Sequence, residues 1–330
     1  MYIIFAIFFM VANSGHHNLN YIIIMLKFKK MAVIALLSAA FTSCSNESVE
    51  TVGNVEEQQV LVPVTVHVSD FSVSQEELGT PSLTRATEDA AAYAGIKELT
   101  LAFYTGDGTQ QYKVKQVKGS LGVGETFGVF SLSLPMGSYT MVVLANGLGT
   151  AGDDVLTLTS PTQAAYTTDL TRETFATTQA VNVNSNTAVD ITATLNRIVA
   201  KFEVHSSDVR TANAAKIRMS LNAGSKAFNP TSGLATSNTG YTMTLPITKS
   251  VGQTTAYGGY IFLTSDEQDI DVTIETLDAD DNVLFSKTVD DVPFKRNRLT
   301  KLTGAMYTNN SIAGAFSVNT DWLTEAETDF

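Results

Sequence analysis

Residues 58–69 read QQVLVPVTVHVS, and this stretch decides the fold. Side chains along a β-strand alternate between two faces, so residues two apart lie on the same face. β-branched residues at this period predict a half-buried strand. Pro63 has no amide to donate, which predicts that the strand lies at the edge of its sheet. The face that we expect to be buried carries five valines: Val60, Val62, Val64, Val66 and Val68.

Similar patterns recur along the chain and predict an all-β protein. Segment 147–180 is less periodic, and we expect a long connection there with one helical turn near residues 162–170. Strands separated by turn signals, without long amphipathic helices between them, are typical of β-sandwiches. We expect two tandem sandwiches, over residues 45–194 and 195–330. Further strands are predicted at residues 96–104, 112–117, 126–134, 139–145, 188–193, 198–205, 216–221, 241–245, 259–263, 270–277, 283–289, 298–307 and 312–320.

The N-terminal region predicts export. Residues 27–44 read KFKKMAVIALLSAAFTSC, in which lysines precede an apolar run and small residues precede Cys44. This order is typical of a secretory signal peptide, here spanning residues 1–44. A cysteine at the first mature position indicates a lipoprotein, whose several acyl chains would give a stable membrane anchor. The apolar residues before Met25 do not fit this pattern, so we expect translation to start at Met25.

The net charge of the chain limits the classes of partner that it can bind. Three of the 21 Lys and Arg residues and none of the 33 Asp and Glu residues precede Cys44, so the part after it carries 18 basic against 33 acidic groups, a net charge of −15. Such a surface disfavours nucleic acid and anionic lipid as partners. Cys44 is the only cysteine, so the chain forms no internal disulfide.

Candidate chemistry is scarce, and we predict that the protein is not an enzyme and holds no cofactor or metal. Beyond the signal peptide the only histidines are His67 and His205, each within a predicted strand and without a second ligand nearby. Residues 278–282, DADDN, weakly resemble a calcium loop, but the glycine and glutamate that such a loop needs are missing. A solvated hairpin turn is the better interpretation of this segment.

Three features together resemble a known family. They are the lipoprotein signal, a lone arginine in the polar segment 83–87 (LTRAT), and two C-terminal stretches, residues 195–204 (LNRIVAKFEV) and 293–304 (PFKRNRLTKLTG), followed by Asp321 and Trp322. The chain resembles the fimbrillins of Bacteroidetes, the type V pilus subunits, in precursor form. The resemblance implies two transthyretin-like, Greek-key β-sandwiches. It also implies maturation by an arginine-specific protease, which would cut here between Arg85 and Ala86.

A cut at this position would release the valine strand, residues 58–74, together with the lipid. An edge strand has one row of unpaired backbone groups and is removed at lower cost than a central strand. Its loss would leave an apolar groove that a strand from a neighbour could fill. The candidate donor is the C-terminal segment, where Ile312, Phe316, Val318 and Trp322 share one parity. The alternative is that this segment is simply the last strand of its own sandwich.

The predicted function is structural. We expect a fimbrial subunit, most simply a stalk pilin, that is exported to the outer membrane as a lipoprotein and then polymerises with other fimbrial subunits, including its own copies, in a surface fimbria. A tip or anchor subunit is the first alternative. A lipid-anchored glycan-binding protein is the second, and it would need exposed aromatic residues, for which the candidates are Tyr93, Tyr104, Tyr241, Tyr257 and Tyr260.

Overall fold

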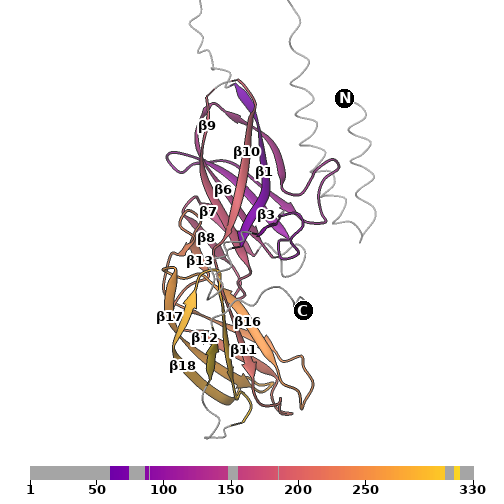
Figure 1. The fold of residues 1–330 in the computed structure, drawn as a ribbon, viewed down its shortest axis with the longest axis vertical. Helices are drawn as coiled ribbons and strands as arrows, with labels where there is room; N and C mark the ends of the chain where they lie inside the picture. Colours follow the sequence, from indigo (N-terminus) through magenta and orange to yellow (C-terminus); the bar gives the residue numbers. More distant parts are fainter. Residues whose placement is uncertain are drawn as a thin grey trace, which may run out of the picture. The chain divides into compact units, whose positions relative to one another are not determined.

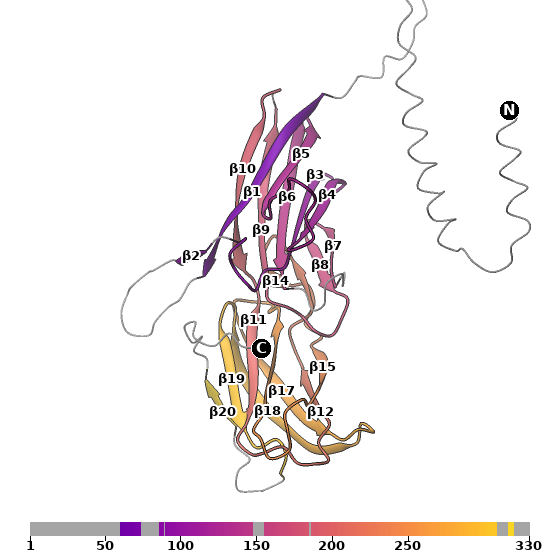
Figure 2. The ribbon, with the colours of Figure 1, turned by 90° about the vertical axis from the view of Figure 1, so that its right-hand side faces the viewer.

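The computed structural model describes residues 60–73, 86–88, 90–147, 155–184, 186–308 and 316–319. All regular elements in these ranges are β-strands, so the predicted all-β class is confirmed (Figures 1 and 2). The chain from Gln58 onward forms one compact unit. Several predicted features lie outside the described residues, namely the signal peptide with Cys44, the cleavage residue Arg85, and the tail residues Ile312 and Trp322.

In the described part of the chain, ten strands precede residue 198. They are β1 (Leu61–Val73), β2 (Ala86–Glu88), β3 (Glu98–Thr105), β4 (Gln110–Val117), β5 (Val129–Pro135), β6 (Gly137–Asn146), β7 (Leu156–Ser160), β8 (Gln163–Tyr166), β9 (Thr174–Val183) and β10 (Val189–Arg197).

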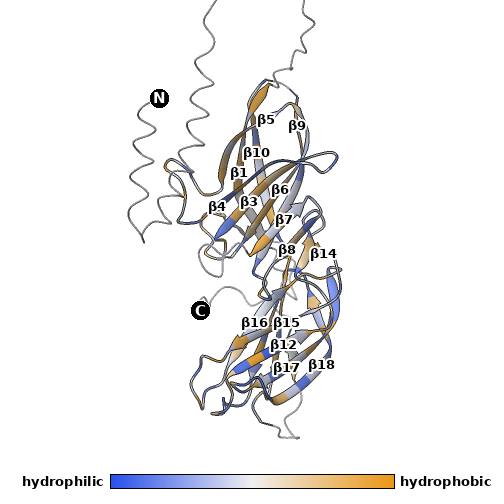
Figure 3. Cartoon of the chain, turned by 180° about the vertical axis from the view of Figure 1, so that it is seen from behind, coloured by the Kyte–Doolittle hydropathy of each residue, from blue (hydrophilic) through white to orange (hydrophobic). Residues whose placement is uncertain are grey.

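Ten more strands follow among the described residues after 198. They are β11 (Ala200–Ser206), β12 (Lys216–Leu221), β13 (Ala227–Asn229), β14 (Leu234–Ala235), β15 (Tyr241–Pro246), β16 (Ala256–Ile261), β17 (Glu267–Leu277), β18 (Val283–Lys295), β19 (Leu299–Gly304) and β20 (Ser317–Asn319). Figure 3 shows hydrophobic stretches along strands of both halves of the described chain.

The first sheet has eight strands in the order β2-β1-β10-β9-β6-β3-β4, and β5 pairs with β1. Alternate residues of β1, β3, β5, β6 and β10 point into one apolar core, which contains Val64, Leu101, Phe103 and Met141 among others. The predicted half-buried valine strand is confirmed, because this core buries Val62 through Val68 at every second position.

The predicted edge position of the valine strand is wrong. β1 pairs in parallel with β10 over Val64 to Ser72, and antiparallel with β5 over Leu61 to His67. Figure 2 shows β1 running between these two strands. Among the described residues β5 pairs only with β1, so β5 is the outer strand and β1 is not.

Pro63 is compatible with this interior position because of the direction of its nitrogen. Val68 donates its amide to the Gly128 carbonyl on the β5 side, at 2.7 Å. Backbone groups alternate along a strand, so the nitrogen of Pro63, an odd number of residues away, points to the β10 side. The ladder with β10 begins only at Val64, so the missing amide of Pro63 interrupts neither ladder.

The expected long connection at residues 147–180 is also wrong in part. The segment contains β7, β8 and the first part of β9, and β8 occupies the position of the predicted helical turn. β7 and β8 join β13 and β14 in a small sheet of order β14-β13-β8-β7. The strands of this sheet therefore come from both sides of the expected domain boundary at 194/195, which itself falls within β10. The two-domain division stays a prediction.

A second apolar core lies on the other face of β3, β6 and β9. It contains Ala102, Tyr104 and Val142 from the first sheet and Leu156, Leu158 and Phe228 from the small sheet, together with Phe262 after β16. The ring of Phe262 stacks on Phe228 with centroids 4.2 Å apart, and on Tyr166 at 6.3 Å. Both faces of β3 are therefore buried, and seven of its eight residues are inaccessible.

Two four-stranded sheets form the remainder, with orders β16-β11-β19-β20 and β15-β12-β17-β18. Alternate residues of β11, such as Phe202 and Val204, share a third core with Ile217 and Met219 of β12 and Ile274 of β17. The two sheets thus make a sandwich. The DADDN segment is the β17–β18 turn, in which Asp278 accepts the amides of Asp280 and Asn282, so the hairpin interpretation is confirmed.

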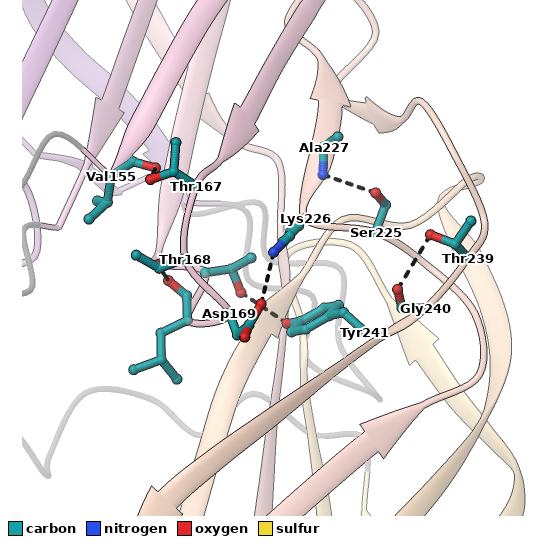
Figure 4. Close-up of polar contacts among 12 residues, drawn as sticks. Val155, Thr167, Thr168, Asp169, Ser225, Lys226, Ala227, Thr239, Gly240 and Tyr241 are labelled. Atoms are coloured by element: carbon teal, nitrogen blue, oxygen red, sulfur yellow. Dashed lines mark hydrogen bonds and ion pairs between the residues drawn. The ribbon is translucent and has the colours of Figure 1, made fainter.

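The segment after β8 is fastened to the chain around β13 and β15 (Figure 4). Lys226 Nζ forms an ion pair with Asp169 Oδ1 at 2.8 Å. Thr171 Oγ1 and Tyr241 OH lie 3.0 Å apart. These contacts join residues about 60 to 70 positions apart in the sequence, which explains why no local pattern predicts them.

Two lysines of β4 cover the outer edge of β7. Lys113 Nζ donates to the Leu158 carbonyl at 2.7 Å, and Lys115 Nζ donates to the Leu156 carbonyl at 3.4 Å. Both carbonyls point away from β8, because Tyr166, which lies opposite Leu156, donates its amide to the Lys226 carbonyl instead, and backbone groups two residues apart point to the same side.

Removal of the Phe262 ring tests the second core. We expect Phe262→Ala to lower the free energy of unfolding by about 3–5 kcal/mol, because the stacked rings around it cannot close the cavity. Denaturant titration of the full chain measures this change. Val123→Ala, at a fully exposed position, is the control and should change stability by less than about 0.5 kcal/mol. Equal effects of the two variants would contradict a core role for Phe262.

Candidate functional site

The candidate site is β1 together with the two strands that hold it. Val62, Val64, Val66 and Val68 are 0–2% exposed, whereas Val60, just before the strand, is 47% exposed. The opposite face carries Leu61, Pro63 and His67, all exposed, and Thr65, which is half-buried. The five-valine pattern therefore supplies four buried side chains and one exposed one.

Each buried valine lies directly opposite a residue of β5, of β10 or of both strands. Val66 lies opposite Phe130 of β5 and Ile191 of β10. Val64 lies between Leu132 and Val189. Val62 lies opposite Leu134 and Val68 opposite Ala193. Directly opposed side chains on one sheet face are about 5 Å apart at Cβ, so these residues form the walls of the space that β1 fills.

The predicted cleavage position is followed at once by β2. Ala86, the residue after Arg85, pairs with Val73, and Glu88 pairs with Phe71, in a short antiparallel ladder. The partner of β2 in the described structure is the end of β1. Loss of β1 would therefore also release residues 86–88 from the sheet.

The predicted donor segment is only partly described. Residues Ser317–Asn319 form β20, which pairs antiparallel with β19, and Val318 lies opposite Leu302. Phe316 is half-buried against the third core, over Gly304, where an added Cβ would lie 2.7 Å from the ring. This part of the segment therefore has a partner within its own chain and must detach from β19 before it can be donated.

A polar cluster fixes the chain immediately after β2. Tyr93 OH donates to Glu173, with 2.9 and 3.0 Å to the two carboxylate oxygens, and its ring packs edge-on against Phe175. Burial, followed by the neighbouring Glu173 charge, raises the pKa of Tyr93 well above its usual range. A Cβ at Gly95 would lie 2.5 Å from the Tyr93 ring and 2.6 Å from Glu173 Oε2, so only glycine fits beside this contact.

The cluster continues to the turn between β18 and β19 through Arg197. Its guanidinium forms an ion pair with Glu173 at 2.7 Å and lies 5.1 Å from the centre of the Phe175 ring. Arg197 Nη1 also donates to Asn297 Oδ1 at 2.8 Å. Asn297 has φ of 59°, a left-handed conformation that asparagine tolerates better than most residues, in the turn between β18 and β19.

The sequence did not predict this cluster. Arg197 and Asn297 belong to the stretches that carry the family resemblance, yet they are 100 positions apart, and no spacing rule connects them with Tyr93 or Glu173. One signal was available. Arg197 follows Ile191, Ala193 and Leu195 on the inward face of β10, and a buried charge needs a partner.

The tyrosines considered for sugar binding do not form an exposed platform. Tyr104 is fully buried, and Tyr93, Tyr241, Tyr257 and Tyr260 are all half-buried. A polar hollow of about 650 Å³ lies beside β9, β10 and the β18–β19 turn, and none of its lining residues is aromatic. Four of its charged residues pair with one another, Lys295 with Glu267 and Arg296 with Asp266, and the fifth, Arg197, pairs with Glu173.

The two histidines have different surroundings. His67 is exposed on the outer face of β1. His205 Nε2 lies 2.9 Å from Glu203 Oε2, and Lys201 Nζ lies 2.9 Å from the other carboxylate oxygen. These partners, His205 first, lower the pKa of Glu203 to about 2. Within the described ranges we find no group of three His, Cys, Asp or Glu side chains suited to a metal ion, and no helix with the length and apolar content of a membrane span.

Comparison with protein families identifies the chain. The model of a family of unknown function, DUF6562, matches residues 61–329. The chain belongs to this family. The match begins at the first residue of β1, so the DUF6562 region includes the valine strand. No curated protein matches the chain.

Solved structures similar to this DUF6562 chain include fimbrial proteins, candidate adhesins and a candidate polysaccharide-binding protein of Bacteroides thetaiotaomicron. The fimbrial anchor protein Mfa2 of Porphyromonas gingivalis is 12% identical, with a TM-score of 0.46 over 80% of this chain and 98% of that chain. A candidate adhesin of Bacteroides ovatus is 12% identical, with a TM-score of 0.48 over 81% and 97%. A fimbrial assembly protein of Parabacteroides distasonis is 14% identical, with a TM-score of 0.37 over 79% and 98%.

Breaking the buried ion pair tests the polar cluster. We expect Arg197→Met to lower the free energy of unfolding by about 3–5 kcal/mol, because it leaves the Glu173 carboxylate buried without its cation. Adding Glu173→Gln should restore part of this loss. Lys295→Met removes the exposed pair with Glu267 and should change stability by less than about 1 kcal/mol. Denaturant titration of these variants and of Glu173→Gln alone makes the measurement, and a double variant as unstable as the sum of its two single changes would argue against the pairing.

The lowered pKa of Glu203 predicts a pH effect. The ordinary pKa of a glutamate carboxyl is 4.5, and a group whose pKa is lower in the folded state stabilises the fold at pH values above this. This stabilisation is lost as the pH falls from 4.5 to about 2. We therefore expect the free energy of unfolding of the wild type to fall more steeply over this range than that of Glu203→Gln. Identical pH profiles in urea titrations would contradict this account of the Lys201–Glu203–His205 cluster.

Proposed function

We propose that the protein is a subunit of a surface fimbria, exported as a lipoprotein through Cys44, cut between Arg85 and Ala86, and joined to neighbouring subunits by exchange of β1 for another strand. The observation that carries the proposal is β1 itself. Four of its valines fill the first core, and the segment that follows contains Arg85 immediately before the next paired strand.

The interior position of β1 changes how such an exchange must proceed. Burial of four valines contributes roughly 6–12 kcal/mol. Each backbone hydrogen bond of the two ladders adds about 1 kcal/mol. This sum is comparable to the whole stability of an ordinary domain, about 5–15 kcal/mol. After the cut, β1 therefore stays in place until an incoming strand replaces its contacts, rather than leaving an open groove.

The polar cluster around Tyr93 supports a cut at this point. Ala90 and Ile96 are fully buried in the first core, and Tyr93 is bonded to Glu173. The chain after Arg85 is thus anchored from Tyr93 onward by a contact with Glu173 that does not involve β1. The mature protein would keep its fold beyond this anchor while residues 45–85 are exchanged.

The donor in this proposal remains the C-terminal segment with Ile312, Phe316, Val318 and Trp322. β20 is a three-residue strand at the edge of its sheet, so few backbone bonds hold it to β19. A segment that can detach and be donated to the groove of another fimbrial subunit favours a stalk role. A tip subunit, or an anchor that keeps its lipid, is the alternative within the same class.

The N-terminus of the protein in its native cells tests the proposal. We expect the chain in the purified fimbrial fraction to begin at Ala86. Arg85→Lys keeps the positive charge but is not a substrate for an arginine-specific protease, and it should remain a lipid-bearing chain outside the fimbriae. Mass spectrometry of both fractions makes the measurement. A wild-type surface chain that begins at acylated Cys44, or a lysine variant that enters fimbriae normally, would overturn the proposal.

A further inference from the structure

The space that β1 occupies is limited to valine-sized side chains. Val62, Val64, Val66 and Val68 are 0–2% exposed, so no solvent-filled volume remains beside them. In the plane of the sheet they touch the walls formed by β5 and β10, and beyond them lie buried residues such as Leu101, Phe103 and Met141. Larger side chains in a filled core force strained rotamers and backbone shifts, at about 1–3 kcal/mol each.

The register of an occupant is also limited. At one end of the space, Gly128 has φ of 88°, and a Cβ there would lie 3.0 Å from the Val68 carbonyl oxygen. The ladder with β5 ends next to this glycine, where the last pair joins His67 and Val129. The pairing with β10 is irregular between Val68 and Asp70. The regular part of the groove therefore has four positions at which the side chain of an occupant points into the core, and it ends at Val68.

The tail of this chain does not match these four positions. Its same-parity residues are Ile312, Gly314, Phe316, Val318, Thr320 and Trp322. The two registers that place three of its large apolar residues inward start at Ile312 or at Phe316. Both put the Phe316 ring where a valine now lies. The register that starts at Ile312 also places Gly314 in a pocket and leaves a void there. The register that starts at Phe316 also places Trp322 in a pocket.

We propose that the groove between β5 and β10 accepts a strand with valine-sized, β-branched residues at four successive inward positions, parallel to β10, and rejects the tail of another copy of this chain through Phe316. The inference rests on the proposed strand exchange and names the partner. The donor strand comes from a subunit of a different kind, and this chain's own tail enters a groove with larger pockets elsewhere in the fimbria.

Strand exchange into the nicked full-length chain tests this inference. A site for a sequence-specific protease, inserted after Arg85, allows one clean cut. Three fluorescent peptides are then offered: residues 58–73, residues 308–323, and residues 308–323 with Phe316→Val. We expect the first peptide to exchange into the chain and the native tail peptide to bind at least about tenfold more weakly, with Phe316→Val recovering a large part of the difference.

The outcomes separate the two proposals. If the native tail peptide binds as tightly as residues 58–73, or if Phe316→Val brings no gain, the size selection is wrong while strand exchange stands. If no peptide exchanges, including the one with the sequence of β1 itself, strand exchange is wrong and the selection falls with it.

Variants of the uncut chain give an independent readout of the same pockets. Val64→Phe and Val66→Phe should each lower Tm by about 5 °C or more, because the added volume has no space in the core. His67→Phe places the same ring on the exposed face of the same strand and should leave Tm within about 2 °C. If Val64→Phe and Val66→Phe have no larger effect than His67→Phe, the pockets are not limited in size and the inference is overturned.

Discussion

The burial of one face of β1 between two ladders is the constraint on which the first half of the molecule depends. A buried backbone amide or carbonyl without a partner costs as much as a lost hydrogen bond, so β5 and β10 both need a strand in this position. The same strand carries the valines that complete the apolar core. Whatever occupies this position must therefore satisfy two rows of backbone groups and four side-chain pockets at once, which makes the position selective.

Two further features connect the first sheet to the rest of the chain. The core around Phe228 and Phe262 covers the outer face of β3 and β6, and the Glu173–Arg197–Asn297 contacts reach the β18–β19 turn. The first is non-directional apolar packing, and the second fixes orientation through charged hydrogen bonds. Neither involves β1. The contacts that hold the two halves of the chain together are thus separate from the strand that we propose is exchanged.

The sequence predicted the strand class and the buried parity of β1 because period-two alternation is a local signal. It predicted most strands of the second half for the same reason. It did not predict β7, β8 and β9, whose Thr- and Ala-rich sequences have little apolar contrast, and whose formation depends on β13 and β6, at a distance in the chain. Pro63 was misleading because its effect depends on which neighbour its nitrogen faces, and this is set by the pairing register. The residues of the polar cluster are brought together only by the tertiary fold.

The lysines that lie along β7 have a consequence for how copies of the protein can meet. An unprotected strand edge is a template on which any extended chain can add, and crowded secreted β-proteins aggregate by this route. At β7 the ammonium groups of Lys113 and Lys115 already occupy two outward carbonyls, and an approaching strand would have to desolvate both charges. This flank of the small sheet is therefore a poor template for an added strand.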